Sequence, residues 1–110
     1  MDEATRIART ESLFRDVNER IAEAAQRFDA REAEFVCECA DAACTDRVEA
    51  PLTDYERVRD EPTQFLVVPG HEDTRVEAVV RLGRRFAVIE KFAPRVAAVV
   101  RRLDPRATAA

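Results

Sequence analysis

The first third of the chain alternates apolar and polar positions with the period of a helix. No glycine or proline interrupts residues 1–50. Apolar residues recur at spacings of three and four, which predicts one amphipathic helix packed on the rest of the protein. They are Phe14, Val17, Ile21, Ala24 or Ala25, and Phe28. The charged residues between them, including Glu11, Arg15 and Glu19, are expected to face solvent.

Two features of this helix stay open. It begins either near Ala4, with Ile7 extending the stripe, or at Ser12 after a frayed arm of residues 1–10. The stripe covers about two heptads, which is fewer than a coiled coil needs. Packing on the protein's own sheet is therefore favoured, and a homodimer through the helix face between Phe14 and Phe28 is the alternative.

The middle of the chain is typical of short strands. Residues 34–39, 44–50, 64–68 and 86–92 are predicted strands, and residues 40–43 form a turn. Thr53 and Glu56 have capping-box spacing and predict a short helix that ends before Pro62.

Residues 75–82 fit either a helix or a strand, and we favour a strand paired with 86–92. Pro94 begins a last helix whose buried side carries Val96, Val99, Val100 and Leu103. Pro105 ends it, and residues 106–110 are predicted to fray.

These elements predict a single α+β domain over residues 1–110. The N-terminal amphipathic helix packs on a small, mostly antiparallel sheet, and a helix ends the chain. The composition, 46% hydrophobic and 36% charged, is that of a foldable globular domain. No apolar run approaches the ~20 residues of a membrane span, and no secretory signal is visible, so a cytoplasmic protein is expected.

Charge is unevenly spread along the chain. Residues 31–63 carry ten acidic residues against four arginines, whereas residues 64–110 carry nine basic residues against five acidic ones. We interpret this as weak attraction between two parts of the surface. The net charge of −4 argues against nucleic acid as the main partner.

The scarce residues carry the candidate chemistry. Cys37, Cys39 and Cys44 form a C-x-C-x4-C pattern, and the only histidine, His71, follows Pro69 and Gly70. Three thiolates and one imidazole are a recognised ligand set for structural zinc. Gly70 is expected to let the backbone approach the site closely. Such a clip would tie a hairpin to a distant loop, which stabilises a small core.

Other interpretations of the same residues stay open. The cysteines can be buried free thiols, two can form a disulfide, or the four ligands can hold an iron–sulfur cluster. A Cys/His pair can also act as nucleophile and base, although no catalytic motif accompanies it. Glu38, Asp41 and Glu72 lie near the ligands in sequence and are candidates for orienting His71.

Several blocks of the sequence resemble a group of small uncharacterised actinobacterial proteins. The blocks are Phe35-Val36-Cys37-Glu38-Cys39-Ala40-Asp41 with Cys44, Tyr55-Glu56-Arg57-Val58-Arg59, Pro62-Thr63-Gln64-Phe65 and Pro69-Gly70-His71-Glu72. The likeness covers roughly residues 11–92 and implies a bacterial cytoplasmic protein with a metal site. It implies no activity.

The sequence therefore favours a non-enzymatic zinc-binding protein that works through contacts with another protein, as an interaction or regulatory module. The reason is that the ligand set is complete and no catalytic motif accompanies it. A redox or metal sensor using the same four ligands is one alternative, because zinc thiolates are oxidisable. An iron–sulfur protein and a small cysteine-dependent enzyme are the others.

Overall fold

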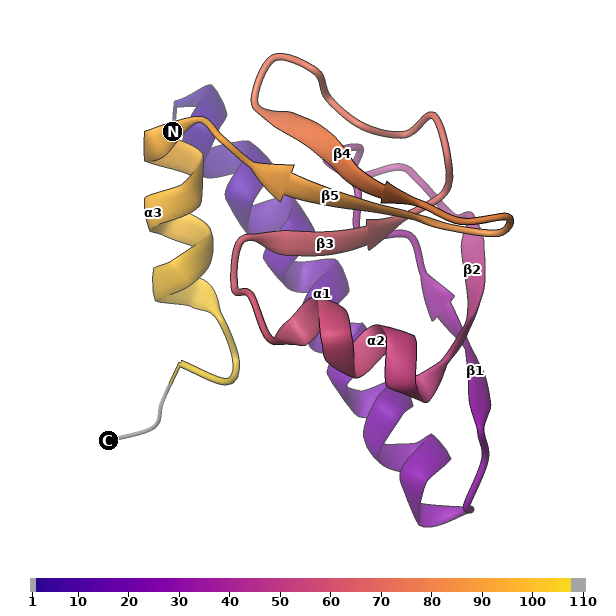
Figure 1. The fold of residues 1–110 in the computed structure, drawn as a ribbon. Helices are drawn as coiled ribbons and strands as arrows, with labels where there is room; N and C mark the ends of the chain where they lie inside the picture. The colour runs from indigo at the N-terminus through magenta and orange to yellow at the C-terminus, as the bar shows by residue number, and fades with distance from the viewer. Residues whose placement is uncertain (1, 108–110) are drawn as a thin grey trace.

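A computed structural model describes residues 2–107. Over these residues it has three helices and five strands (Figure 1). In chain order they are α1 (Glu3–Arg27), β1 (Glu32–Val36), β2 (Arg47–Pro51), α2 (Leu52–Arg59), β3 (Gln64–Val67), β4 (Glu77–Leu82), β5 (Ala87–Lys91) and α3 (Pro94–Leu103). The predicted α+β class is confirmed, and the ambiguous segment 75–82 contains a strand.

The strands form two antiparallel sheets. β1 pairs with β2, and β5 lies between β3 and β4 in the second sheet. The sheets are joined where the chain leaves β1, because the Glu38 amide donates to the Leu66 carbonyl at 2.8 Å. The residues just after β1 therefore connect the two halves of the fold.

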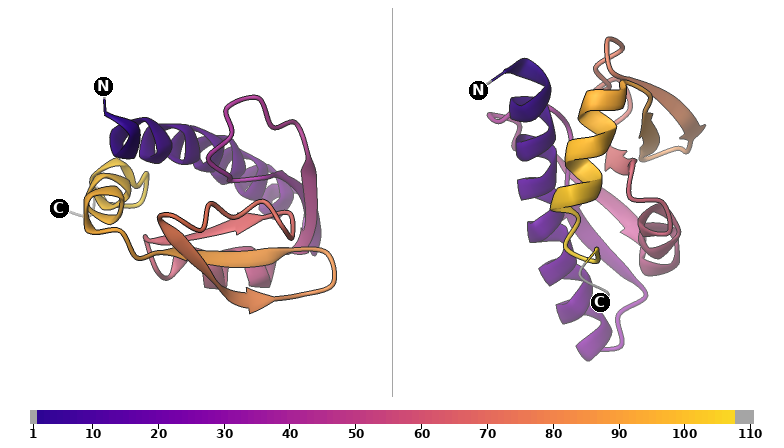
Figure 2. Two further views of the ribbon diagram at one scale, coloured as in Figure 1. Left: turned by 90° about the horizontal axis from the view of Figure 1, so that it is seen from above. Right: turned by 90° about the vertical axis from the view of Figure 1, so that its left-hand side faces the viewer.

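α1 is the longest element and forms one outer side of the molecule (Figure 2). α3 lies beside its N-terminal half and β1 beside its C-terminal half (Figure 1). The Asp2 carboxylate caps the helix by accepting from the Thr5 amide at 2.8 Å, and Ile7 and Ala8 are buried. Of the two predicted starts, the one near Ala4 agrees with the structure, and residues 3–10 are helical where the other predicted a frayed arm; Met1 lies outside the described residues.

The predicted buried face of α1 is also wrong. Side chains from the predicted apolar stripe and beside it are exposed: Phe28 is 83% exposed, Leu13 63% and Val17 40%. The buried face is largely polar and consists of Ile7, Ala8, Glu11, Ser12, Arg15, Asn18 and Ala22. The opposite charges that allow this burial come from distant segments, so the period of α1 alone could not show it.

Glu38 is the centre of the first buried polar group. Its carboxylate accepts from Arg15 at 3.1 Å, from Asn18 at 3.0 Å and from the Leu66 amide at 2.8 Å. The Arg15 guanidinium also lies 3.8 Å from the centre of the Phe65 ring. A buried charge is tolerated only when it is paired and hydrogen-bonded, and this one is.

Lys91 forms the second buried polar group with Glu11 of α1 and Glu77 of β4. All three side chains are fully buried. Burial raises the pKa of Glu11 well above its usual value, and the like charge of Glu77 adds to this effect against the attraction of Lys91. α1 is thus held to the second sheet by charge as well as by packing.

A third polar group holds the C-terminal segment. Arg59 pairs with Asp104 and with Glu19, and Glu19 also accepts from the Tyr55 hydroxyl at 2.7 Å. Arg106 pairs with Glu19 at 2.6 Å and with Glu56 at 2.8 Å. The predicted fraying of residues 106–110 is therefore wrong at Arg106, and residues 108–110 lie outside the described part of the chain.

The apolar core joins buried residues of all three helices and both sheets. Phe35 and Tyr55 stack with ring centroids 4.5 Å apart, beside buried Phe65 and Ile89. α2 begins at Leu52 with Pro51 as its N-cap and has no side-chain cap, so the predicted capping box is not formed.

α3 begins at Pro94 as predicted and buries Val96, Ala97 and Val100. Val99 is half-buried, while Leu103, which was expected inside, is 37% exposed.

We expect Asn18→Ala to lower the free energy of unfolding by about 2–3 kcal/mol. Asn18 donates to the Val36 carbonyl at 2.9 Å and accepts from the Val36 amide at 2.8 Å, and both backbone groups would lose their partner. Arg9→Ala, at an exposed position of the same helix, is the control. Equal denaturant midpoints for the two variants would contradict this role.

Candidate metal centre

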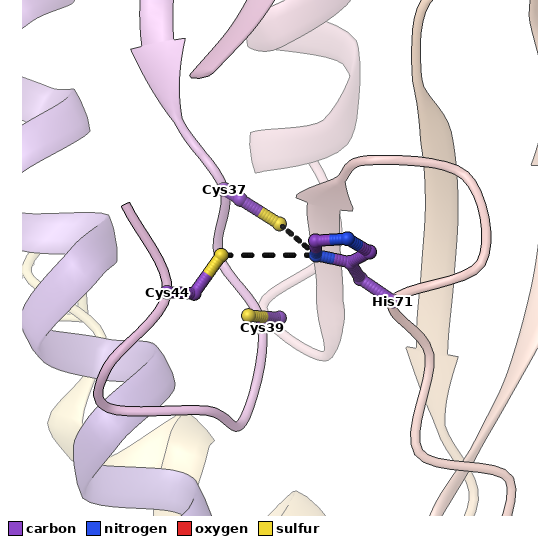
Figure 3. Close-up of side chains that lie close together, drawn as sticks. All are labelled: Cys37, Cys39, Cys44 and His71. Atoms are coloured by element: carbon purple, nitrogen blue, oxygen red, sulfur yellow. Dashed lines mark hydrogen bonds between the residues drawn. The ribbon is translucent and has the colours of Figure 1, made fainter. Parts of the chain in front are cut away.

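The four candidate ligands come from three separate segments (Figure 3). Cys37 and Cys39 follow β1, Cys44 lies in the loop before β2, and His71 follows β3. All four predicted ligands converge, because the Cys37, Cys44 and Cys39 sulfurs and one His71 ring nitrogen lie within 4.8 Å of one another. Cys37 and Cys39 are buried, whereas Cys44 and His71 are half-buried.

Two distances between donor atoms match a single tetrahedral ion. The His71 Nδ1 atom is 3.5 Å from the Cys37 sulfur and 3.7 Å from the Cys44 sulfur. Zinc bonds of tetrahedral geometry place a sulfur and a nitrogen ligand about 3.6 Å apart. The chemistry of the four donors and these two sulfur–nitrogen distances therefore fit a zinc ion.

Two turns bring the ligands together. In the first, the Asp41 carboxylate accepts from the Ala43 amide at 2.9 Å, and the Asp41 carbonyl accepts from the Cys44 amide at 3.0 Å. Aspartate often closes a turn in this way. The predicted turn at 40–43 is thus confirmed and brings Cys44 back beside Cys37.

The second turn carries His71. The His71 amide donates to the Val68 carbonyl at 3.0 Å, with Pro69 and Gly70 between them. Gly70 has φ of 93°, as the third position of a type II turn requires. No atom lies within 4 Å of where a Gly70 Cβ would stand, so the expected close approach of the backbone is wrong. The left-handed φ is the reason for glycine here.

The carboxylate beside the outer nitrogen of the imidazole belongs to Asp46, a residue that sequence reasoning missed. The Asp46 carboxylate lies 3.4 Å from His71 Nε2, the ring nitrogen that does not face the thiols. A carboxylate on the second nitrogen is the usual arrangement around a metal-bound histidine. Strand alternation gives the signal that could have found it, because residues 44 and 46 share a side of an extended segment.

The three acids predicted as candidates for orienting His71 lie elsewhere. Glu38 points away from the thiols toward Arg15 and Asn18, and Asp41 closes the first turn. Glu72 has a buried carboxylate oxygen without a hydrogen-bond partner among the described residues. None of the three has a hydrogen bond or ion pair to His71 in residues 2–107.

The thiols strongly influence one another's ionisation. Interaction with Cys37 lowers the pKa of Cys39 to about 5, and interaction with Cys39 together with burial raises the pKa of Cys37. Burial also raises the pKa of Cys44. The Cys37 sulfur accepts from the Val68 amide at 3.2 Å, which favours the thiolate at that position.

The arrangement of the cysteines bears on the alternatives of a disulfide and of isolated buried thiols. All three cysteines are free thiols, so no disulfide is formed. They converge on His71 instead of dispersing through the core, which is not how isolated buried cysteines pack. Four protein donors can fill the coordination of one zinc ion.

Comparison with protein-family models, with curated proteins and with solved structures finds no match. In the part of the chain that the structure describes, no helix has both the length and the apolarity needed to cross a bilayer.

Replacing Asp46 should weaken metal binding without removing a ligand. We expect Asp46→Ala to lower zinc affinity about tenfold or more in competition with a chelator, because the His71 ring loses its orienting acceptor. Glu49→Ala is the matched control, since it removes the same charge from an exposed position on β2. Equal zinc affinities for these two variants would show that Asp46 does not act on His71.

Proposed function

We propose that this chain is a small, non-enzymatic zinc-binding protein in which Cys37, Cys39, Cys44 and His71 hold one structural zinc ion. One observation carries the proposal: donor atoms from three segments meet within 4.8 Å, with sulfur–nitrogen distances of 3.5 and 3.7 Å. These distances suit a single ion better than an iron–sulfur cluster, whose ligands surround a larger object.

The number of ligands supports a structural ion. Catalytic zinc keeps a position open for water or substrate, whereas four protein ligands close the coordination shell. A bound ion would neutralise the clustered thiolates and fix residues 37–39 against the turn that carries His71. In a 110-residue chain with many buried charges, that link would contribute directly to folding.

The proposal also covers where the protein acts and what it binds. Free thiols suit a reducing cytoplasm, and the resemblance to small actinobacterial proteins suggests a bacterial one. We infer that the protein works by binding another protein, in an interaction or regulatory role. Exposed apolar side chains support this part: Phe28 and Leu82 are 83% and 70% exposed.

The position of Cys44 favours a second candidate, a redox sensor with the same ligands. Cys44 is half-buried, while Cys37 and Cys39 are buried, so an oxidant meets Cys44 first. Mild peroxide distinguishes the two functions. A sensor releases zinc and recovers it after treatment with a thiol reductant, whereas a structural site retains its zinc.

Metal analysis of protein purified without added metal tests the proposal. We expect one zinc ion per chain, and we expect a chelator to remove it together with much of the thermal stability. His71→Ala should lower zinc content and melting temperature together. Stable, folded protein without metal would contradict the proposal, and a brown protein with visible absorbance would assign the ligands to an iron–sulfur cluster instead.

A further inference from the structure

The outer face of α1 is apolar although nothing in the described structure covers it. Leu13, Val17, Ala24 and Phe28 lie within about 60° of one another around the helix, at 100° per residue. Leu13, Val17 and Phe28 are 63%, 40% and 83% exposed. α1 forms an outer side of the molecule (Figure 2), and the exposure of these three side chains leaves the face open to a partner.

A row of charges runs along one edge of this face. Asp16, Arg20, Glu23 and Arg27 fall within a second arc of about 60°, next to the apolar one. Acid and base alternate along the row. Among residues 2–107 none of these four side chains has a partner in an ion pair or side-chain hydrogen bond, although many other acids and bases are paired.

The order of these charges is complementary to itself. When two helices pack antiparallel about a two-fold axis, each edge of one helix meets the same edge of the other. With the axis midway between Arg20 and Glu23, Arg20 faces the second copy's Glu23, and Asp16 faces the second copy's Arg27. Every acid in the row then meets a base.

The same register also fits the apolar residues. Phe28 of one copy falls at the level of residue 15 of the other, between Phe14 and Val17 along the axis. The smaller Ala24 and the half-buried Ile21 lie near the centre, where the helices approach most closely. A parallel arrangement would instead place the charged row against the Phe14 edge, which would desolvate four charges without opposite partners.

We propose that the partner of the α1 outer face is a second copy of this chain, bound as an antiparallel two-fold dimer. This dimer would supply the protein partner that the proposed function calls for. It rests on the proposed function only because the protein tested is folded and loaded with zinc. The surface that it uses is separate from the metal ligands, which lie on the loops after β1 and β3.

The test is the mass in solution, measured by analytical ultracentrifugation of zinc-loaded protein over a concentration series. We expect a dimer. Arg20→Glu should raise the dimer Kd at least about tenfold, because two attractive contacts become repulsive. Combining Arg20→Glu with Glu23→Arg should restore dimerisation. The two central charges are then exchanged, and they again meet opposite charges across the two-fold axis of the antiparallel arrangement.

Two further variants keep the test decisive. Val17→Asp should also separate the copies, and Arg57→Glu, an exposed reversal on α2, should leave the dimer intact. Zinc content and circular dichroism of each sample show whether a variant has lost the metal or the fold instead of the contact. A monomeric wild-type protein, or a dimer that resists both Arg20→Glu and Val17→Asp, would overturn the proposal.

Discussion

The Glu38 carboxylate accepts hydrogen bonds from α1 and β3 at once, while the neighbouring residues Cys37 and Cys39 direct their thiols to the candidate metal centre. Successive side chains of an extended segment point to opposite sides. Residues 37–39 therefore connect the candidate metal centre to the buried polar face of α1. The two sheets, α1 and the His71 turn all depend on this segment keeping its position.

This arrangement gives the proposed zinc ion a structural role. Glu38, Arg15, Lys91, Glu11 and Glu77 are buried, and a buried ion pair stabilises little more than apolar packing would. Removing one partner of such a pair lowers the free energy of unfolding by about 3–5 kcal/mol, because the other charge stays buried without a partner. An ion that fixes Cys37 and Cys39 also fixes Glu38 between them, and so keeps the polar network of α1 paired.

The sequence predicted the local features well and the burial of α1 badly. The four ligands, the turn at 40–43 and Pro94 at the start of α3 follow from spacing and residue type, and the structure confirms that the four converge. The buried face of α1 does not follow from the period of its apolar residues, because Glu38 and Lys91 provide partners for the polar face and draw it inward. Asp46 was missed since its role requires knowing where His71 lies.

The central claim is that the candidate metal centre and the buried face of α1 are linked through one segment, residues 37–39. Zinc affinity of Glu38→Gln, measured by competition with a chelator, tests it most directly, because Glu38 is not a ligand. The account predicts an affinity at least about tenfold below that of Glu34→Gln, an exposed control on β1, since a charged buried acceptor is lost. Equal zinc affinities for the two variants would contradict it.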